Sequence, residues 1–325
     1  MRRALVLLML AAALLCGCAG ASGGPAEPEK LSVVATVFPI YDWTRNLLGA
    51  SESVELTLLL DSGVDLHSFQ PGVDDLMAVA SCDLLIYVGG ESDDWIADAL
   101  SESSNPRQRA LNLLEVLDAS ALTEELREGM QGEADGAADE HIWLSPRRAS
   151  ALCRAIAAAL AELDPANAAL YAQNCAAYME ALGELEADCA DLARLAAEAE
   201  VRPCLVVADR FPFRYLAEDC GLDYYAAFPG CSAETGASFE TVRFLARKLD
   251  ERGGGLLFTT ENPIPGVAET VARTAQTEDV QLLTLDSMQS VTRADVEGGE
   301  TYLAVMRRNL DALTEAFGTK EQVWH

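Results

Sequence analysis

The chain has 325 residues, of which 50% are hydrophobic, and a formal net charge of −29 at pH 7. This length suits one large bilobed protein or a protein of two domains. The charge excludes proteins that hold nucleic acid or anionic lipid electrostatically, and it attracts cations over the whole surface without selecting among them.

The N-terminus has the organisation of an export signal. Two arginines precede an apolar stretch over residues 4–15, which is too short to span a bilayer with ordinary flanks. The stretch ends in Leu15-Cys16-Gly17-Cys18, which resembles the bacterial lipobox, so residues 1–17 are predicted to be a lipoprotein signal peptide. We therefore expect an extracytoplasmic protein anchored to the cell membrane by a lipid on Cys18. The alternative is an ordinary signal peptide that happens to contain cysteines.

The next segments predict a tether and then an α/β lobe. Residues 18–30 are rich in Gly, Ala, Ser, Pro and Glu and cannot bury a core. Short apolar strands then alternate with amphipathic helices, which favours a parallel sheet covered on both faces. The predicted strands are 31–37, 54–60 and 84–88, and the predicted helices are 40–48 and 73–80. The acidic, glycine-containing segment 122–140 breaks this pattern and is predicted to be a mobile surface loop.

One long helix is predicted to link this lobe to a second one. Residues 165–200 are rich in Ala, Leu and Glu, with Asp164 as the expected N-cap and Pro165 at the first helical position. After it the α/β alternation resumes, with strands at 204–208, 256–259 and 281–285 and helices at 213–219, 239–252, 267–276 and 300–317. We therefore predict two α/β lobes with central parallel sheets, over 31–163 and 201–325, joined by a helix over 164–200.

Two of the three histidines lie in loops. His67 follows the second predicted strand, and ligands collect at the carboxyl ends of strands in α/β sheets. His141 lies where the acidic loop re-enters the fold, and His325 is the last residue. Because neither His67 nor His141 falls on an apolar helical face, both are candidate metal ligands.

An ordered set of motifs resembles the metal-binding lipoproteins of zinc and manganese ABC importers, the TroA-like family with a rigid helical backbone. Each motif alone is weak, but the ordered set is specific and covers nearly all of the mature chain. The motifs are Val33–Asp42, Gly63–Pro71, Asp83–Ile96, Glu140–Pro146, Ala208–Leu216 with Cys220–Leu222, and Thr284–Ser287.

The resemblance implies a metal site with one position changed. His67, His141 and Asp286 fall on metal ligands of the family. At the third ligand position this chain has Arg210, whose guanidinium cannot bind a cation. Asp209, Glu234 or water is expected to replace that ligand, and we favour Glu234. Arg210 is then expected to pair with a carboxylate nearby, either Asp286 or Glu234.

The predicted ligands bear on the cargo. Two imidazoles with carboxylates suit Zn²⁺ and also Mn²⁺, and the order of affinities favours zinc. The resemblance implies that the protein is a monomer without enzymatic activity that passes the metal to the permease of an ABC importer. The acidic loop lies where zinc-binding relatives keep a histidine-rich loop. It either recruits cations weakly or is only a solvated insertion.

Other functions are open on the sequence alone. A metallohydrolase also uses two histidines and a carboxylate, but the chain lacks a His-Glu-x-x-His motif and a nucleophile elbow. A receptor for an anionic organic ligand or metal chelate, or an adhesin on the same scaffold, gains support from Arg210. The seven cysteines after Cys18 contain no Cys-x-x-Cys pair, and the sequence leaves open one disulfide among Cys204, Cys220 and Cys231.

Overall fold

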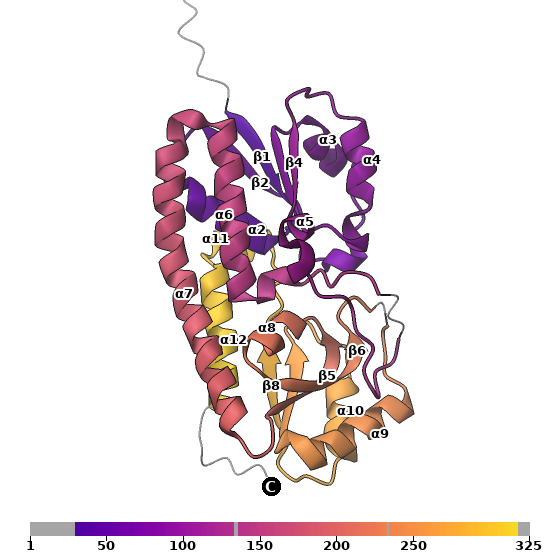
Figure 1. Ribbon diagram of the computed structural model, residues 1–325. Helices are drawn as coiled ribbons and strands as arrows, with labels where there is room; N and C mark the ends of the chain where they lie inside the picture. Colours follow the sequence, from indigo (N-terminus) through magenta and orange to yellow (C-terminus); the bar gives the residue numbers. More distant parts are fainter. Residues whose placement is uncertain (1–29, 133–135, 233, 318–325) are drawn as a thin grey trace, which may run out of the picture. The chain divides into compact units, whose positions relative to one another are not determined.

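A computed structural model describes residues 30–132, 136–232 and 234–317. From Leu31 onward the chain forms one compact unit (Figure 1). The lipidation position Cys18 and the terminal His325 lie outside the described residues, so the predicted anchor stays a prediction.

The first sheet has four parallel strands. Its central strand reads Leu-Ser-Val-Val-Ala, and both Val33 and Val34 are buried because helices cover the two faces of the sheet. The strand order is β2-β1-β3-β4. The strands are β1 (Leu31–Ala35), β2 (Val54–Leu58), β3 (Leu84–Tyr87) and β4 (Arg109–Asn112). The three predicted strands are confirmed, and β4 was not predicted.

Five helices accompany this sheet. Local signals set their ends: Ser145 accepts a hydrogen bond from the backbone of Arg148 at the start of α6, with Pro146 at the first helical position. Asp75 accepts from the backbone of Gly72 and closes the start of α3. The helices are α2 (Phe38–Leu48), α3 (Val73–Ser81), α4 (Trp95–Ser101), α5 (Leu113–Leu117) and α6 (Pro146–Leu163).

The second sheet repeats the topology of the first. Its strand order is β6-β5-β7-β8, again wholly parallel. The strands are β5 (Cys204–Phe211), β6 (Asp223–Pro229), β7 (Leu256–Thr260) and β8 (Gln281–Leu285). The helices are α8 (Arg214–Asp219), α9 (Phe239–Lys248), α10 (Val267–Thr274), α11 (Arg293–Glu297) and α12 (Tyr302–Phe317). Strand β6 was not predicted.

The long helix α7 (Ala168–Glu198) has 31 residues, which corresponds to about 46 Å at 1.5 Å per residue. A single 3₁₀ turn at Pro165–Asn167 precedes it, so Asp164 occupies the N-cap position of that turn and Asn167 that of α7. The helix contacts α2 and α6 of the first lobe and α8 and α12 of the second (Figure 1). The fold class predicted from the sequence, two α/β lobes linked by one long helix, is confirmed.

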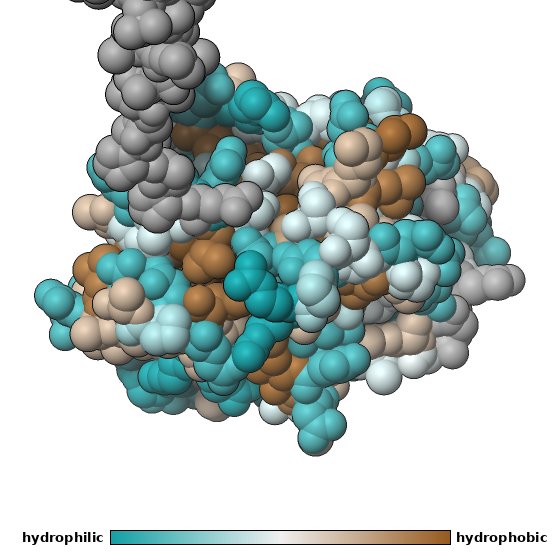
Figure 2. All heavy atoms as spheres, turned by 90° about the horizontal axis from the view of Figure 1, so that it is seen from above, coloured by the Kyte–Doolittle hydropathy of each residue, from teal (hydrophilic) through white to brown (hydrophobic). Residues whose placement is uncertain are grey.

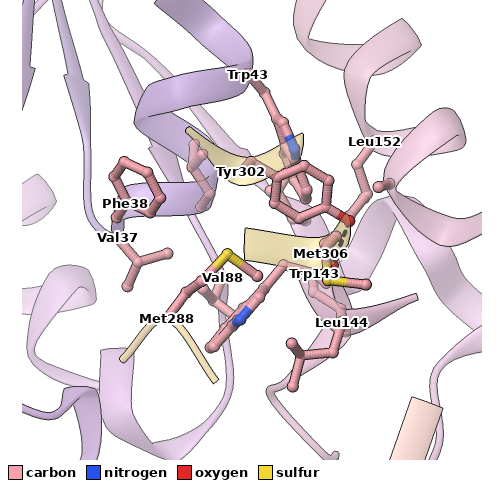
Figure 3. Packing of buried hydrophobic residues seen from close by; sticks show 14 of the residues in the cluster. Val37, Phe38, Trp43, Val88, Trp143, Leu144, Leu152, Met288, Tyr302 and Met306 are labelled. Carbon is pink, nitrogen blue, oxygen red and sulfur yellow. Dashed lines mark hydrogen bonds between the residues drawn. The ribbon is translucent and has the colours of Figure 1, made fainter. Parts of the chain in front are cut away.

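One hydrophobic cluster extends over both lobes, and a second, smaller one lies within the second lobe. Met288, just after β8, packs in one buried cluster with Val37, Phe38 and Trp143 of the first lobe (Figure 3). The indole nitrogen of Trp143 donates to the carbonyl of Ser287 at 2.8 Å. These contacts anchor the segment after β8 to the segment that carries His141.

Figure 2 shows polar and apolar side chains interspersed on the face seen from above. Within the described ranges, no helix is long and apolar enough to cross a membrane.

Candidate metal centre

His67 is positioned by a 3₁₀ turn after β2. The turn spans Leu66–Ser68, and Asp65 caps it by accepting a hydrogen bond from the backbone N–H of His67 at 2.9 Å. The other carboxylate oxygen of Asp65 lies 3.0 Å from the guanidinium of Arg210. The cap therefore fixes the loop that carries the imidazole, and an arginine from the second lobe fixes the cap.

His141 is fully buried and is held by a carboxylate two residues before it. Oδ1 of Asp139 accepts the backbone N–H of His141 at 3.0 Å and its ring Nδ1–H at 2.8 Å. A hydrogen bond at Nδ1 leaves Nε2 as the nitrogen with a free lone pair. Carboxylate–histidine pairs of this kind orient imidazoles in metal sites.

The two imidazoles face each other. Nε2 of His67 lies 3.1 Å from Nε2 of His141, and the ring centroids are 5.1 Å apart. Two nitrogens bound to one tetrahedral Zn²⁺ at 2.0–2.1 Å would be separated by about 3.3 Å. The pair is therefore spaced almost as a shared zinc ion requires.

A polar layer surrounds the other nitrogen of His67. Nδ1 of His67 lies 2.8 Å from the hydroxyl of Ser92 and 3.6 Å from Oε2 of Glu140. Oε1 of Glu140 accepts the backbone N–H of Ser92 at 2.9 Å, whereas the buried Oε2 has no hydrogen-bond partner. Glu140 is not among the ligands predicted from the sequence, although it adjoins His141 directly.

Further potential ligands lie against the histidines. His67, His141 and Cys231 each offer a ligand atom, and these three atoms lie within 4.8 Å of one another. Glu124, Asp139 and His141 form a second such group. A cavity opens at this place, lined among others by His67, Glu124, Glu140 and Cys231. From the sequence alone, Cys231 is only a possible disulfide partner and Glu124 only part of the acidic loop.

Burial and neighbouring charges shift the titration of this cluster. Burial lowers the pKa of His67 to about 3, and the adjacent His141 adds to this effect. Burial also opposes charge on His141, but the hydrogen bond and charge of Asp139 outweigh it and raise the pKa of His141. Burial and the charge of Asp139 raise the pKa of Glu124, and burial and the charge of Glu124 raise that of Cys231.

The carboxylates predicted as ligands lie outside both groups. Asp286 follows β8, where its Oδ1 accepts the backbone N–H of Met288 at 2.8 Å. Burial raises the pKa of Asp286 to about 6, and the charge of Glu261 acts in the same direction. Glu234 is exposed and donates its backbone N–H to the hydroxyl of Ser232. The structure thus brings the two predicted histidines together. Asp286 and Glu234 lie outside these groups, and their role as ligands stays a prediction.

Asp209 and Arg210, the two other candidates in the cleft, are engaged elsewhere. The buried Asp209 accepts hydrogen bonds from the backbone and hydroxyl of Thr260 at 3.2 and 2.6 Å. Arg210 pairs with Asp65, so the expected ion pair with Asp286 or Glu234 is wrong. The reason is topological: Arg210 lies near the end of β5, where it reaches the loop that follows β2.

The described cysteines are free thiols. Six of them are buried, and Cys231 is half-buried at the metal centre. The open question of one disulfide among Cys204, Cys220 and Cys231 is therefore answered in the negative for this structure.

Comparison with known families gives one match over most of the chain. A family model described as "Zinc-uptake complex component A periplasmic" (ZnuA) matches residues 33–316. The match begins in β1 and ends in α12, so it includes both lobes and the linking helix.

Individual relatives are similar at low identity. The zinc-binding lipoprotein AdcA of Streptococcus pneumoniae is 27% identical over 314 residues, which are 96% of this chain and 60% of AdcA. The zinc-binding protein AdcA of Streptococcus pyogenes is 26% identical over 297 residues, and the chain spans only 55% of its length. The chain thus spans little more than half of these curated relatives.

Two solved structures share the fold. The Zn(II)-bound ZnuA-like domain of S. pneumoniae AdcA superimposes with a TM-score of 0.67 at 25% identity, over 89% of this chain and 100% of that domain. The periplasmic zinc-binding protein TroA of Treponema pallidum gives a TM-score of 0.70 at 23% identity, over 89% of this chain and 99% of TroA. At that identity the second likeness shows the fold alone.

Proposed function

This chain belongs to the ZnuA family of periplasmic zinc-uptake components, and we propose that it captures a divalent transition metal outside the cytoplasm and delivers it to the permease of an ABC importer. The family predicted from the sequence motifs is thereby confirmed. Zinc is the proposed cargo and manganese the second choice, because two imidazoles favour zinc in the order of affinities.

One observation carries the proposal: the 3.1 Å separation of the two Nε2 atoms. Asp139 fixes the Nδ1–H tautomer of His141, so its Nε2 lone pair points toward His67. Two imidazole nitrogens this close repel each other unless a proton or a cation lies between them. A metal ion at that point is held by two rigid, pre-oriented ligands.

His67 and His141 are the primary ligands in this proposal. Asp286, as the family resemblance implies, and Glu234, in place of the ligand that Arg210 cannot supply, are the candidates for the remaining positions. The position of Asp286 supports this, because the next residue, Ser287, accepts a hydrogen bond from Trp143, and the ring of Trp143 packs 5.5 Å from that of His141. The support for Glu234 is only its place three residues after Cys231.

We propose that the protein acts as a monomer held at the outer face of the cell membrane by a lipid on Cys18. The lipobox-like sequence supports the anchor, and one relative is named a lipoprotein. The relatives described above are named for metal binding, which agrees with a transport role rather than an enzyme. The receptor for an anionic ligand loses support, because Asp65 already neutralises the guanidinium of Arg210.

The proposal is tested by titrating the protein with Zn²⁺ and Mn²⁺ in competition with a chelator. Wild type should bind one zinc ion tightly. His67→Ala should weaken zinc binding by more than about 100-fold, because loss of an outer-shell partner alone typically costs 10–100-fold. The same measurement on Asp286→Asn and Glu234→Gln decides whether those carboxylates are ligands.

His325→Ala is the matched control, since it removes an imidazole that the proposal does not use. It should bind zinc as wild type does. Wild-type affinity in His67→Ala, or no metal bound by the wild type at all, would show that this chain does not capture metal at this place.

A further inference from the structure

We propose that the thiolate of Cys231, rather than the carboxylate of Glu234, is the third protein ligand of the metal and supplies what Arg210 cannot. The inference rests on the proposed function, since it concerns the same site. It differs from the family resemblance, which points to an imidazole or carboxylate at the end of β5 and to no cysteine.

The geometry places the sulfur within reach of a shared ion. The Sγ atom of Cys231 and one ring nitrogen each of His67 and His141 all lie within 4.8 Å of one another. Around a tetrahedral Zn²⁺, with Zn–S near 2.3 Å and Zn–N near 2.0–2.1 Å, sulfur and nitrogen are separated by about 3.6 Å. A small movement of one side chain therefore closes the coordination.

Topology makes Cys231 the counterpart of His67. β2 and β6 are the edge strands next to β1 and β5 in their sheets. The segment that follows each of these edge strands leads to the metal centre. His67 follows β2, and Cys231 follows β6. The two sheets have the same strand order, so each lobe contributes a metal-binding side chain from the same topological position.

The backbone around Cys231 holds it against His141. Its N–H donates to Oε1 of Glu124 at 3.2 Å. Gly230, the residue before Cys231, lies close to the ring of His141. A Cβ atom added to Gly230 would be only 2.8 Å from Cε1 of His141. A residue without a side chain is therefore needed for the close approach of this segment to the imidazole.

A second observation, at Glu140, favours a cation at this place. The carboxylate of Glu140 lines the same cavity, yet the residue is only 2% exposed and its Oε2 has no hydrogen-bond partner. A buried carboxylate oxygen without a partner is costly in free energy. A divalent ion bound by His67, His141 and Cys231 would place positive charge across the His67 ring from this carboxylate, whose Oε2 lies 3.6 Å from Nδ1 of His67.

The chemistry of sulfur sets the expected selectivity. When the ion binds, the S–H bond breaks, the proton leaves to solvent, and the sulfur donates an electron pair to the metal. Thiolate is a soft ligand that favours zinc, whereas manganese prefers oxygen ligands. The site should therefore prefer zinc over manganese in affinity more strongly than a site of histidines and carboxylates alone would.

Cobalt(II), which takes the place of zinc and absorbs light, is the probe. Titration of the full chain with Co²⁺ should produce the intense near-ultraviolet absorption of a thiolate-to-cobalt charge transfer. Cys231→Ser should lose that absorption, and its zinc affinity should fall at least about tenfold while its manganese affinity changes little. Circular dichroism of the variant checks that it folds.

Cys175→Ser is the matched control, because it removes a thiol from α7 far along the chain from the centre. It should keep the absorption and the zinc affinity. Tight cobalt binding without the charge-transfer band in wild type, or the band retained in Cys231→Ser, would overturn the cysteine ligand and leave metal capture standing. Failure of the wild type to bind cobalt or zinc would instead overturn the proposed function.

Discussion

At the scale of single residues, Asp139 determines how His141 can act. One oxygen of Asp139 accepts both the backbone and the ring N–H of His141, so the ring can neither rotate nor change tautomer without losing a buried hydrogen bond. The hydroxyl of Ser92 performs a similar task at His67. The centre is therefore pre-organised, and little ordering remains to be done when a cation arrives.

Arg210 shows what sequence could and could not predict at this scale. The motif order was sufficient to predict that His67 and His141 lie together. The partner of Arg210 could not be predicted, because Asp65 lies 145 positions earlier in the chain and only the folded structure brings the two side chains together. Cys231 was missed for the same reason, since nothing in its own sequence context distinguishes a ligand from a core thiol.

A buried carboxylate near the centre should make stability depend on pH. Burial raises the pKa of Asp93 to about 7, with the charge of Glu140 acting in the same direction. The folded state thus keeps a proton that the unfolded state loses near its ordinary pKa of 3.8. Stability attributable to this group is full below pH 4 and falls as pH rises toward 7, by at most about 1.4 kcal/mol per pH unit.

The measurement is denaturant unfolding of Asp93→Asn and wild type between pH 4 and 8, without metal. The amide cannot ionise, so the variant should gain stability relative to wild type as pH rises through this range. Asp94→Asn, which changes the exposed neighbour, should follow wild type. A constant difference between Asp93→Asn and wild type at all pH values would contradict the assignment.

At the scale of elements, the acidic loop packs more closely than its composition suggests. Thr123 and Ala138 form an antiparallel bridge at its base. Farther out, Arg127 pairs with Asp223 at 2.9 Å, and the backbone of Gln131 donates to the carbonyl of Ala227. The expectation that this segment is mobile stays a prediction, but its described part lies against the second lobe.

Replacing residues 128–136 with a short Gly-Ser linker should keep tight zinc binding. The bridge at the base holds Glu124 and Asp139 in place, and neither lies within the replaced segment. Only weak binding that salt abolishes should disappear, because loose carboxylates bind divalent ions through screened charge. Zinc titration at low and high salt measures both components, and loss of the tight component would make the loop part of the primary site.

Strands with a strong apolar pattern were predicted from the sequence, and strands with a weak one were missed. Strands β1, β3 and β5 each contain a run of buried apolar residues, at 33–35, 84–86 and 204–208, because these parts are covered on both faces. Strand β4 reads Arg-Ala-Leu-Asn at the sheet edge, where exposure removes the apolar signal. Strand β6 follows α8 so closely that its pattern merges with the turn before it.

At the scale of the whole molecule, helix α7 belongs to both lobes. Its buried residues recur every three or four positions along its full length, at Tyr171, Cys175, Tyr178, Leu182, Leu185, Cys189, Leu192 and Ala196. All of these side chains except Ala196 lie in one cluster that also contains Val33 of the first sheet and Phe258 of the second.

Because the lobes share this core, we expect them to unfold together. Scanning calorimetry of the metal-free protein should give a single transition whose calorimetric and van't Hoff enthalpies agree. Leu185→Ala, in the middle of α7, should lower the midpoint without splitting the transition, since a cavity there costs about 2–5 kcal/mol. Two resolved transitions would mean that the lobes are independent.

The shared core also limits how such proteins can be recombined. A chimera that joins the first lobe of this chain to the second lobe of a relative would divide the buried face of α7 between two sequences that never packed against each other. The contacts of Trp143 with Ser287 and of Tyr302 with Trp143 would be divided in the same way. The unit of exchange in this architecture is therefore both lobes with their helix, and metal preference is best transferred by single ligands such as Cys231.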